Sequence, residues 1–203
     1  MMKVNDFLRR AQDICEKQNT IYLMGGWGHS LTWNNSLNEF IQNYAYNKKH
    51  QDALKTALES ARVNNTSLFG FDCGGLIKAI IWGFDADKGE YGGGAVYASN
   101  GLPDVNQEGM LEYYSKEVST DFNNIIPGEI LYMKGHCGIY FGDGMVIECT
   151  PKNTNNVQYS RLEDRKWTKH FKLTAIDYSV DNVVTGSFTC PCCGNVIHYT
   201  LKR

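Results

Sequence analysis

The fold is decided around Phe71-Asp72-Cys73-Gly74-Gly75 and the apolar run that follows it, Leu76-Ile77-Lys78-Ala79-Ile80-Ile81. The run predicts a helix that begins at Cys73, with Asp72 as its N-cap. Unpaired N–H groups and the helix dipole favour an anion at this end, so a thiol there has a lowered pKa and becomes a nucleophile. The alternative is a packing role, because free cysteine is among the most buried residue types.

A second stretch, far downstream, supplies a partner for this cysteine. It is Gly135-His136-Cys137-Gly138-Ile139-Tyr140-Phe141-Gly142-Asp143-Gly144. A cysteine with a distant histidine is the sequence pattern of a nucleophile and its base. Alternating apolar residues predict antiparallel strands from residue 130 onward, over 136–142 and 145–150, with one or two more within 167–178. Residues 151–160, rich in asparagine, are predicted to form a turn.

Together these stretches resemble the NlpC/P60 family of cysteine peptidases. Asp72-Cys73-Gly74-Gly75 is similar to the family's Asp-Cys-Ser-Gly, and residues 135–144 resemble its histidine strand and hairpin. Residues 127–132 (Pro-Gly-Glu-Ile-Leu-Tyr) and 21–26 (Ile-Tyr-Leu-Met-Gly-Gly) are similar to the strand before that hairpin and to an upstream tyrosine and glycine pair. The resemblance covers residues 1–178. Gly74 departs from it, because the family has a serine there.

The resemblance implies an α+β, papain-like fold, in which N-terminal helices and the nucleophile helix pack on a small antiparallel sheet. It implies Cys73 as nucleophile, His136 as its base, and a substrate cleft bordered by Tyr22, Asp72 and Gly74. The implied reaction is hydrolysis of amide bonds in peptidoglycan stem peptides through a thioester, without metal or cofactor. Two alternatives stay open: acyl transfer or transpeptidation on the same fold, and a non-catalytic module that binds the cell wall.

The third catalytic residue is expected to be Glu148, provided that the hairpin register places it on the face of His136. A two-residue turn at Asp143-Gly144 would place Glu148 on the opposite face. A three-residue loop with Gly144 in a left-handed bulge would pair Phe141 with Met145 and Ile139 with Ile147, and would bring Glu148 diagonal to His136. A core needs the second arrangement, because it gathers the apolar residues on one face. The alternative for Glu148 is an exposed strand residue.

The remaining segments are read from periodicity. Residues 4–18 and 104–119 are predicted to be helices, and the loop over 83–103 is rich in glycine and tyrosine. Residues 29–66 form an insertion relative to the family, with a helix predicted over 36–61. The insertion is interpreted as a surface helical hairpin in preference to a lid or wall of the cleft.

Length, composition and charge limit the classes of protein to which the chain can belong. A chain of 203 residues with 42% hydrophobic and 21% charged residues is typical of one globular domain, and a net charge of −2 gives no footprint for nucleic acid. No apolar run is long enough to span a bilayer. Residues 1–20 lack the apolar core of a signal peptide, so we expect cytosolic synthesis and action on the cell wall after release by another route.

The seven cysteines leave an odd thiol, which argues against a complete disulfide framework. The tail over residues 179–203 differs in composition and carries Cys190 and Cys193 at C-x2-C spacing, with His198 as a third candidate zinc ligand. A closed structural zinc site needs four ligands, and no second pair exists. The alternative is a short strand pair with free thiols.

Overall fold

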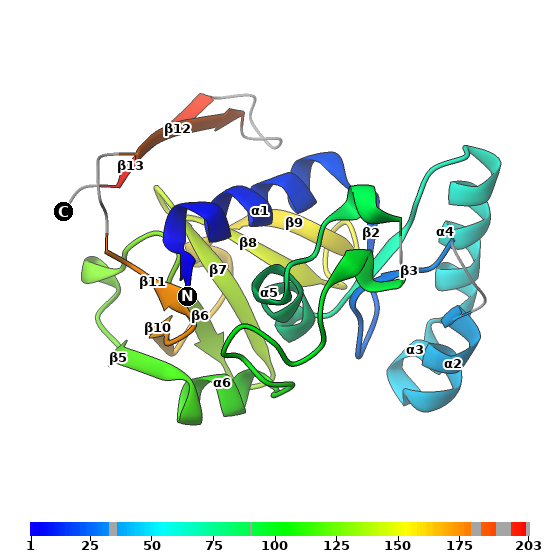
Figure 1. The fold of residues 1–203 in the computed structure, drawn as a ribbon, viewed down its shortest axis with the longest axis horizontal. Helices are drawn as coiled ribbons and strands as arrows, with labels where there is room; N and C mark the ends of the chain where they lie inside the picture. Colours follow the sequence, from blue (N-terminus) through cyan, green and yellow to red (C-terminus); the bar gives the residue numbers. More distant parts are fainter. Residues whose placement is uncertain (33–35, 90, 180–183, 190–195, 202–203) are drawn as a thin grey trace.

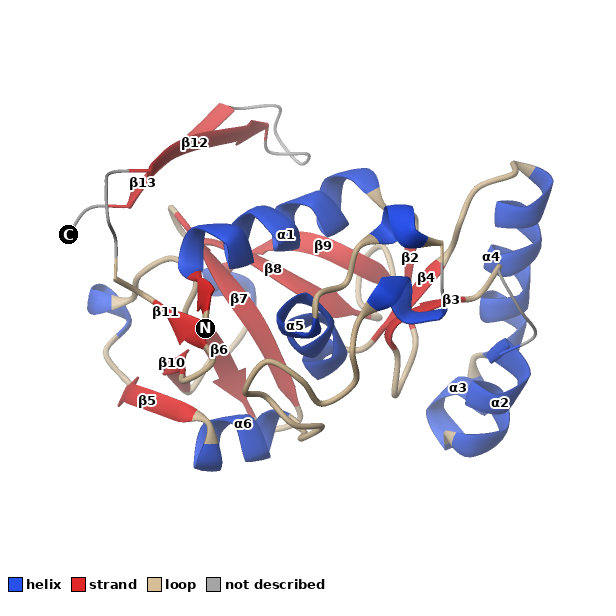
Figure 2. Ribbon diagram, viewed as in Figure 1, coloured by secondary structure: helices blue, strands red, loops and turns tan. Residues whose placement is uncertain are grey.

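The computed structural model describes residues 1–32, 36–89, 91–179, 184–189 and 196–201, and within them the fold is α+β, as predicted (Figures 1 and 2). Its centre is a six-stranded antiparallel sheet in the order β5-β10-β6-β7-β8-β9. The bounds of these strands are β5 Ser115–Ser119, β6 Ile130–Met133, β7 His136–Gly142, β8 Met145–Thr150, β9 Asn156–Arg161 and β10 Lys169–Leu173.

Two helices cover one face of this sheet. Helix α5, Cys73–Trp82, lies in front of β7 in Figure 1 and buries every residue except Lys78. Helix α1, Val4–Lys17, packs beside it through an apolar stripe at helical spacing. The apolar stripe of one helix and the apolar run of the other therefore meet in the main core, which fixes the start of α5 against β7.

Short strands connect the chain around α5. β2 (Thr20–Tyr22) runs parallel to β4 (Phe69–Phe71), β3 (Trp27–Ser30) pairs antiparallel to β4, and β1 (Met2–Lys3) runs parallel to β11 (Ile176–Asp177). Four 3₁₀ turns occur in the described loops, η1 Ala86–Lys88, η2 Tyr91–Gly94, η3 Phe122–Asn124 and η4 Leu162–Asp164. Strand β4 leads directly into α5. The three-stranded sheet β2-β4-β3 therefore determines where Cys73, the first residue of α5, lies.

The tail contains an antiparallel hairpin of β12 (Val184–Thr189) and β13 (Val196–Leu201). His198 lies opposite Ser187 in this pair. Cys190 and Cys193 lie outside the described residues, so the zinc knuckle stays a prediction.

The insertion differs from its prediction as one helix. Its described part forms three helices, α2 Ser36–Asn43, α3 Ala45–Lys49 and α4 Gln51–Val63. Tyr44 breaks the run with an extended backbone, φ −124° and ψ 118°. The break turns Asn47 inward, where its amide bonds to the backbone of Met24. A tertiary hydrogen-bond partner therefore overrides the continuous apolar stripe.

The predicted helix over 104–119 is wrong at both ends. Helix α6 spans only Gln107–Tyr113, and its N-cap is Asn106, whose side chain accepts the Gly109 N–H at 2.9 Å. Asp104 instead forms an ion pair with Lys78. Residues 115–119 become edge strand β5 because they find a partner in β10, which local propensity does not reveal.

The asparagine-rich segment is also shorter than predicted. Asn153 and Asn155 adopt left-handed backbone conformations, as turn asparagines do, but the chain then enters β9. Strand β9 pairs with β8 along its whole length, from Thr150 opposite Asn156 to Met145 opposite Arg161. The prediction of a turn to residue 160 missed this edge strand.

The β7–β8 hairpin combines features of both predicted registers. Gly142 pairs with Met145 across a two-residue turn in which Asp143 and Gly144 both have positive φ, so the predicted Phe141–Met145 pair is wrong. A bulge inserts Phe141 into β7, and the register beyond it pairs Ile139 with Ile147, as predicted. The bulge therefore restores the face that a two-residue turn alone would have reversed.

Candidate active site

Cys73 is the first residue of α5, and its position depends on a dense turn. The Asp72 carboxylate accepts the Gly75 N–H at 2.5 Å and the Gly25 N–H at 2.8 Å. A Cβ on Gly75 would lie 1.8 Å from the Gly26 carbonyl oxygen, whereas a Cβ on Gly74 would meet nothing closer than 3.8 Å. Close backbone approach therefore requires Gly75, while the missing serine hydroxyl at Gly74 is not a steric necessity.

The environment of Cys73 favours its thiolate. A hydrogen bond from the Cys137 thiol lowers the pKa of Cys73 well below its ordinary value, burial opposes this, and the hydrogen bond and charge of His136 lower it further. Its place at a helix N-terminus acts in the same direction. Cys15 contrasts with it, because burial raises the pKa of that thiol to about 12.

His136 begins β7 and lies between two acidic partners. Its Nε2 atom hydrogen-bonds to Oε2 of Glu148, and its ring lies within hydrogen-bonding reach of Cys73. Burial disfavours the charged ring, but the bonds to Cys73 and Glu148 outweigh burial and raise the pKa of His136 to about 9. The ring also stacks on Trp167, with centroids 5.6 Å apart and planes 20° from parallel. This contact restricts rotation of the imidazole out of its plane.

Glu148 on β8 is buried and charged. Only 1% of the residue is exposed, and Nε of Arg165 lies 2.8 Å from Oε1 and 2.6 Å from Oε2. Burial raises the pKa of Glu148, but hydrogen bonds from His136 and Arg165 outweigh burial and hold the pKa below its ordinary value. Arg165 is held in turn by Thr150, whose Oγ1 accepts from Nη2 at 3.0 Å.

The four groups form a line of alternating charge. The thiolate of Cys73, the imidazolium of His136, the carboxylate of Glu148 and the guanidinium of Arg165 follow one another, each in contact with the next. A buried charge is tolerated only when it is paired, and here each internal member has an opposite charge on both sides. This arrangement stabilises the ion-pair form of a thiol and an imidazole.

Sequence reasoning missed three members of this site. Arg165 follows η4 in a charged turn, Trp167 lies two residues later, and the thiol of Cys137 lies beside Cys73. A run such as Arg161-Leu162-Glu163-Asp164-Arg165 is typical of a solvated turn. No local signal distinguishes the inward-pointing arginine from its neighbours.

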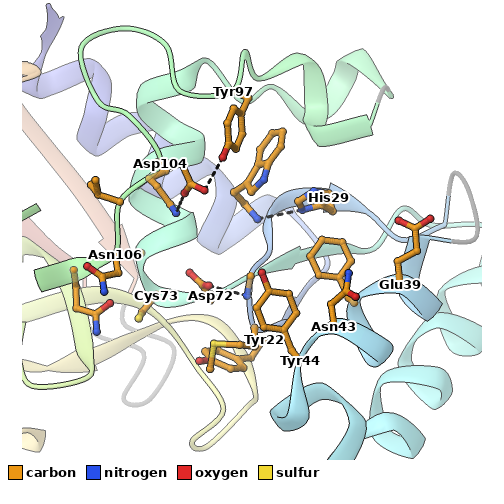
Figure 3. Close-up of a pocket in the computed structure, with 18 of the residues that line it drawn as sticks. Tyr22, His29, Glu39, Asn43, Tyr44, Asp72, Cys73, Tyr97, Asp104 and Asn106 are labelled. Atoms are coloured by element: carbon orange, nitrogen blue, oxygen red, sulfur yellow. Dashed lines mark hydrogen bonds and ion pairs between the residues drawn. The ribbon is translucent and has the colours of Figure 1, made fainter. Parts of the chain in front are cut away.

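A cavity of about 630 Å³ opens at Cys73, and Figure 3 shows its lining. The predicted cleft residues Tyr22, Asp72 and Gly74 all line it. Both oxygens of Asp72 accept backbone N–H groups, and burial with the neighbouring Cys73 charge raises the pKa of Asp72 to about 6. Asp72 therefore shapes the cavity wall through the turn it holds.

The insertion forms one wall of this cavity, which corrects its interpretation as a surface hairpin. Glu39, Phe40 and Asn43 of α2, with Tyr44, line the same cavity as Cys73. The Tyr44 ring packs so closely on Gly25 that a Cβ there would lie 2.3 Å from it. Asn47 is fully buried, and its side chain bonds both the N–H and the carbonyl of Met24 at 3.0 Å. The insertion is thus fastened to the turn that supports Asp72.

Other histidines of the described chain have different surroundings. His29 is buried among aromatic rings, its Nδ1 atom accepts the Trp27 N–H at 3.3 Å, and burial lowers its pKa to about 4. His170 forms a buried pair with Glu129 at 2.5 Å, and its other nitrogen bonds the Asp121 carbonyl oxygen. Both nitrogens of His170 are therefore occupied, and the pair joins the residue that precedes β6 to strand β10.

Neither a metal cluster nor a membrane span is found in the described residues. No three histidine, cysteine, aspartate or glutamate side chains of that part of the chain are grouped so as to hold a metal ion. None of its helices combines the length and apolar character needed to cross a bilayer.

Comparison with known proteins identifies a family. The model of the NlpC/P60 family matches residues 42–175, well over half of the chain, and the matched region contains Cys73, His136 and Glu148. Neither the curated proteins nor the solved structures give a match to it. The motif order, the helix that begins at the cysteine, the histidine on the antiparallel sheet and the family match together lead to one conclusion: the chain belongs to the NlpC/P60 family.

Proposed function

We propose that the protein is a cysteine peptidase that hydrolyses peptidoglycan stem peptides, with Cys73, His136 and Glu148 as its catalytic residues. Membership of the family supports a cell-wall hydrolase. The observation that carries the finer proposal is the alternating chain of charges that ends on the Cys73 thiolate at the cavity. Such an arrangement is suited to nucleophilic attack followed by proton delivery.

In the first half of the reaction, the Cys73 thiolate attacks the carbonyl carbon of the scissile amide and forms a tetrahedral oxyanion. The backbone N–H of Cys73 at the start of α5 is placed to stabilise this oxyanion, and such a donor contributes about 2.7–4 kcal/mol to the transition state. The His136 imidazolium then protonates the leaving amine, the carbon–nitrogen bond breaks, and a thioester remains on Cys73.

In the second half, neutral His136 accepts a proton from water as the water attacks the thioester. The carbon–sulfur bond breaks, the carboxylic product leaves, and the thiolate and imidazolium are restored. Glu148 keeps the imidazole oriented and stabilises its charge, while Arg165 keeps Glu148 ionised. Arg165 and Trp167 are positioning residues, since neither is placed to touch the reacting atoms.

The test is to incubate the protein with purified cell-wall sacculi and with defined stem-peptide fragments, and to identify the products by mass spectrometry. We expect new amino and carboxyl termini within stem peptides, and no cleavage by Cys73→Ala. Release of glycan fragments with intact peptides, or equal cleavage by Cys73→Ala, would contradict the proposal. Products joined to an added amine in place of water would assign acyl transfer instead.

A further inference from the structure

Two thiols meet at the start of α5, and the proposed reaction uses only one of them. The Cys137 thiol donates a hydrogen bond to the sulfur of Cys73, and neither sulfur is part of a disulfide. Because side chains alternate along β7, Cys137 and Ile139 share the face that packs on α5 in the main core. The core therefore holds the two sulfur atoms in contact, and only a small movement separates such a pair from a disulfide.

The two sulfur atoms differ in access and in charge. Cys73 lines the cavity (Figure 3) and is 7% exposed, whereas Cys137 is 1% exposed and does not line the cavity. Cys73 is the sulfur held as a thiolate, and a thiolate is the form of cysteine that reacts with peroxides. A small oxidant that enters the cavity therefore meets Cys73 first and finds a second thiol in contact with it.

The other two described thiols face backbone carbonyl groups. Cys149 on β8 donates to the Phe71 carbonyl oxygen at 3.1 Å, and Cys15 on α1 lies 3.9 Å from that of Val157. Burial raises the pKa of both thiols. A small apolar side chain would fill position 137 as well as cysteine does, because a buried thiol packs as a small hydrophobic group. Only a thiol at this position offers Cys73 a partner for a covalent bond.

We propose that Cys73 and Cys137 form a reversible disulfide when the protein meets a hydroperoxide, which switches the hydrolase off and protects its nucleophile. Cys73 is the sulfur that is oxidised, and Cys137 is the resolving cysteine. Formation of this bond depends on the two thiols and not on which amide the protein hydrolyses.

In the first step, the Cys73 thiolate attacks one oxygen of hydrogen peroxide, a sulfur–oxygen bond forms and the oxygen–oxygen bond breaks. The His136 imidazolium, which contacts Cys73, protonates the departing hydroxide. Water leaves, Cys73 becomes a sulfenic acid, and His136 is neutral. The sulfur has given two electrons to the peroxide.

In the second step, the sulfur of Cys137 attacks the sulfenic sulfur. The hydrogen bond to the Cys73 thiolate is the largest cause that raises the pKa of Cys137, ahead of burial and the charge of that thiolate, and the first step removes the thiolate. Neutral His136 accepts the Cys137 proton and delivers it to the hydroxide that leaves Cys73. Over both steps, two thiols and one peroxide give one disulfide and two water molecules.

The disulfide has a protective consequence. A sulfenic acid without a partner thiol is oxidised further to sulfinic acid, which thiol reductants do not reverse. A disulfide is reduced by thiol exchange, which restores both sulfur atoms. The presence of Cys137 should therefore determine whether inactivation by peroxide is reversible.

The experiment treats the reduced protein with a small molar excess of hydrogen peroxide, removes the peroxide with catalase, and blocks the remaining thiols with N-ethylmaleimide. Trypsin places Cys73 in the peptide 63–78, and Cys137 with Cys149 in the peptide 135–152, so fragmentation in the mass spectrometer identifies the linked sulfur. A second sample is reduced with dithiothreitol after the peroxide is removed, and its activity on stem-peptide fragments is compared with that before treatment.

The wild type is compared with two variants. Cys137→Ser keeps a donor towards Cys73 but cannot form the disulfide. Cys149→Ser is the matched control, because Cys149 is as buried as Cys137 and lies on the neighbouring strand, but its thiol donates to a carbonyl oxygen. If a thermal melt shows that Cys137→Ser is unfolded, Cys137→Val, which keeps an apolar side chain in the core, replaces it.

We expect the wild type to give a peptide linked through Cys73 and Cys137, and to recover more than about nine-tenths of its activity on reduction. Cys149→Ser should behave in the same way. Cys137→Ser should give no linked peptide, should carry sulfinic acid on Cys73, and should recover less than about half of its own starting activity. Sulfinic acid on Cys73 of the wild type, a bond from Cys73 to another cysteine, or equal recovery in Cys137→Ser would overturn the inference.

The peptide map separates this inference from the proposed function. If the wild type hydrolyses no stem-peptide fragment, the proposed function fails, but the linked peptide is still present or absent. Labelling of Cys73 by iodoacetamide then replaces activity as the readout. We expect peroxide to block this labelling and dithiothreitol to restore it in the wild type but not in Cys137→Ser; restoration in both would overturn the inference.

Discussion

The two walls of the cavity are held in place by different means. The wall formed by α5 and the β7–β8 hairpin belongs to the main core and carries the buried charges of Cys73, His136 and Glu148. The insertion wall has a small core of its own, formed by Leu37, Ile41, Leu54, Leu58 and Ala61 with Ile21, Leu23, Leu31 and Leu68. Its links to the site are polar or aromatic, through Asn47 and Tyr44.

Under the proposed function, the first wall carries out the chemistry and the second wall selects the substrate. A wall locked into the main core holds reacting groups at fixed distances, which proton transfer needs. A wall with its own core can change its side chains without moving those groups. Substitutions in the first wall should therefore act on kcat, and substitutions in the second on KM and on the choice of substrate.

The largest expected effect is that of Cys73→Ala, which removes the nucleophile. We expect kcat/KM on stem-peptide fragments to fall at least about a thousandfold, while the unfolding midpoint stays close to that of the wild type. Cys15→Ala is the control and should retain activity, because the Cys15 thiol lies away from the cavity and has a pKa raised by burial. In the intact protein, iodoacetamide should label Cys73 more than about a hundredfold faster than Cys15 at pH 7. Comparable labelling rates would contradict the thiolate assignment.

The next largest effect is expected at Glu148. Glu148→Ala should lower kcat by about a hundredfold or more, because it removes the acceptor that orients His136 and leaves Arg165 buried without its carboxylate. Glu148→Gln should retain more activity, since an amide oxygen can still accept from the ring, although it does not neutralise the imidazolium. Steady-state kinetics with a thermal melt for each variant separates catalysis from folding. A folded Glu148→Ala protein with activity within about twofold of the wild type would remove Glu148 from the mechanism.

A smaller effect on activity and stability is expected when the pH of the wild-type protein is raised. His136 has its pKa raised from 6.5 to about 9, so the imidazolium persists through neutral pH, and activity should decline only as the pH rises through about 9. Because the folded-state pKa exceeds the unfolded one, the charged ring contributes to stability most fully below pH 6.5, and this contribution is lost as the pH rises through about 9. Titration of the His136 ring by NMR should give a lower pKa in Cys73→Ala, where the thiolate is absent. An unchanged pKa would show that the two groups are not coupled.

The smallest effect on chemistry is expected from Asn47→Leu in the insertion wall. Loss of its amide leaves the Met24 N–H and carbonyl unsatisfied, which costs about 1–3 kcal/mol of stability. We expect KM to rise several-fold while kcat stays within about twofold. The reason is that α2 moves, whereas the line of charges from Cys73 to Arg165 does not. Asn64→Leu is the control, since its exposed amide bonds only within its own helix end. A fall in kcat as large as that of Glu148→Ala would show that the two walls are not independent.

Local sequence patterns predicted most of the wall formed by α5 and the β7–β8 hairpin. This wall depends on features formed by residues close in the chain, namely the cap at Asp72, the apolar run after Cys73 and the alternation in the hairpin. Each of them therefore leaves a signal in a short window of sequence. The face of Glu148 was predicted, although the bulge at Phe141 and not a three-residue loop produces it. Such features are determined by backbone geometry that neighbouring residues encode.

Only the tertiary structure determined the insertion wall and the place of Arg165 at the end of the line of alternating charge. The continuous helix that the sequence favours is broken at Tyr44, and Asn47 is buried where Met24 offers its amide both a donor and an acceptor. Arg165 turns inward because a buried carboxylate on β8 needs a second cation, and β5 becomes a strand because β10 has a free edge. In each case the stabilising partner lies far away in the chain, and a contact between distant residues leaves no periodic pattern around either of them.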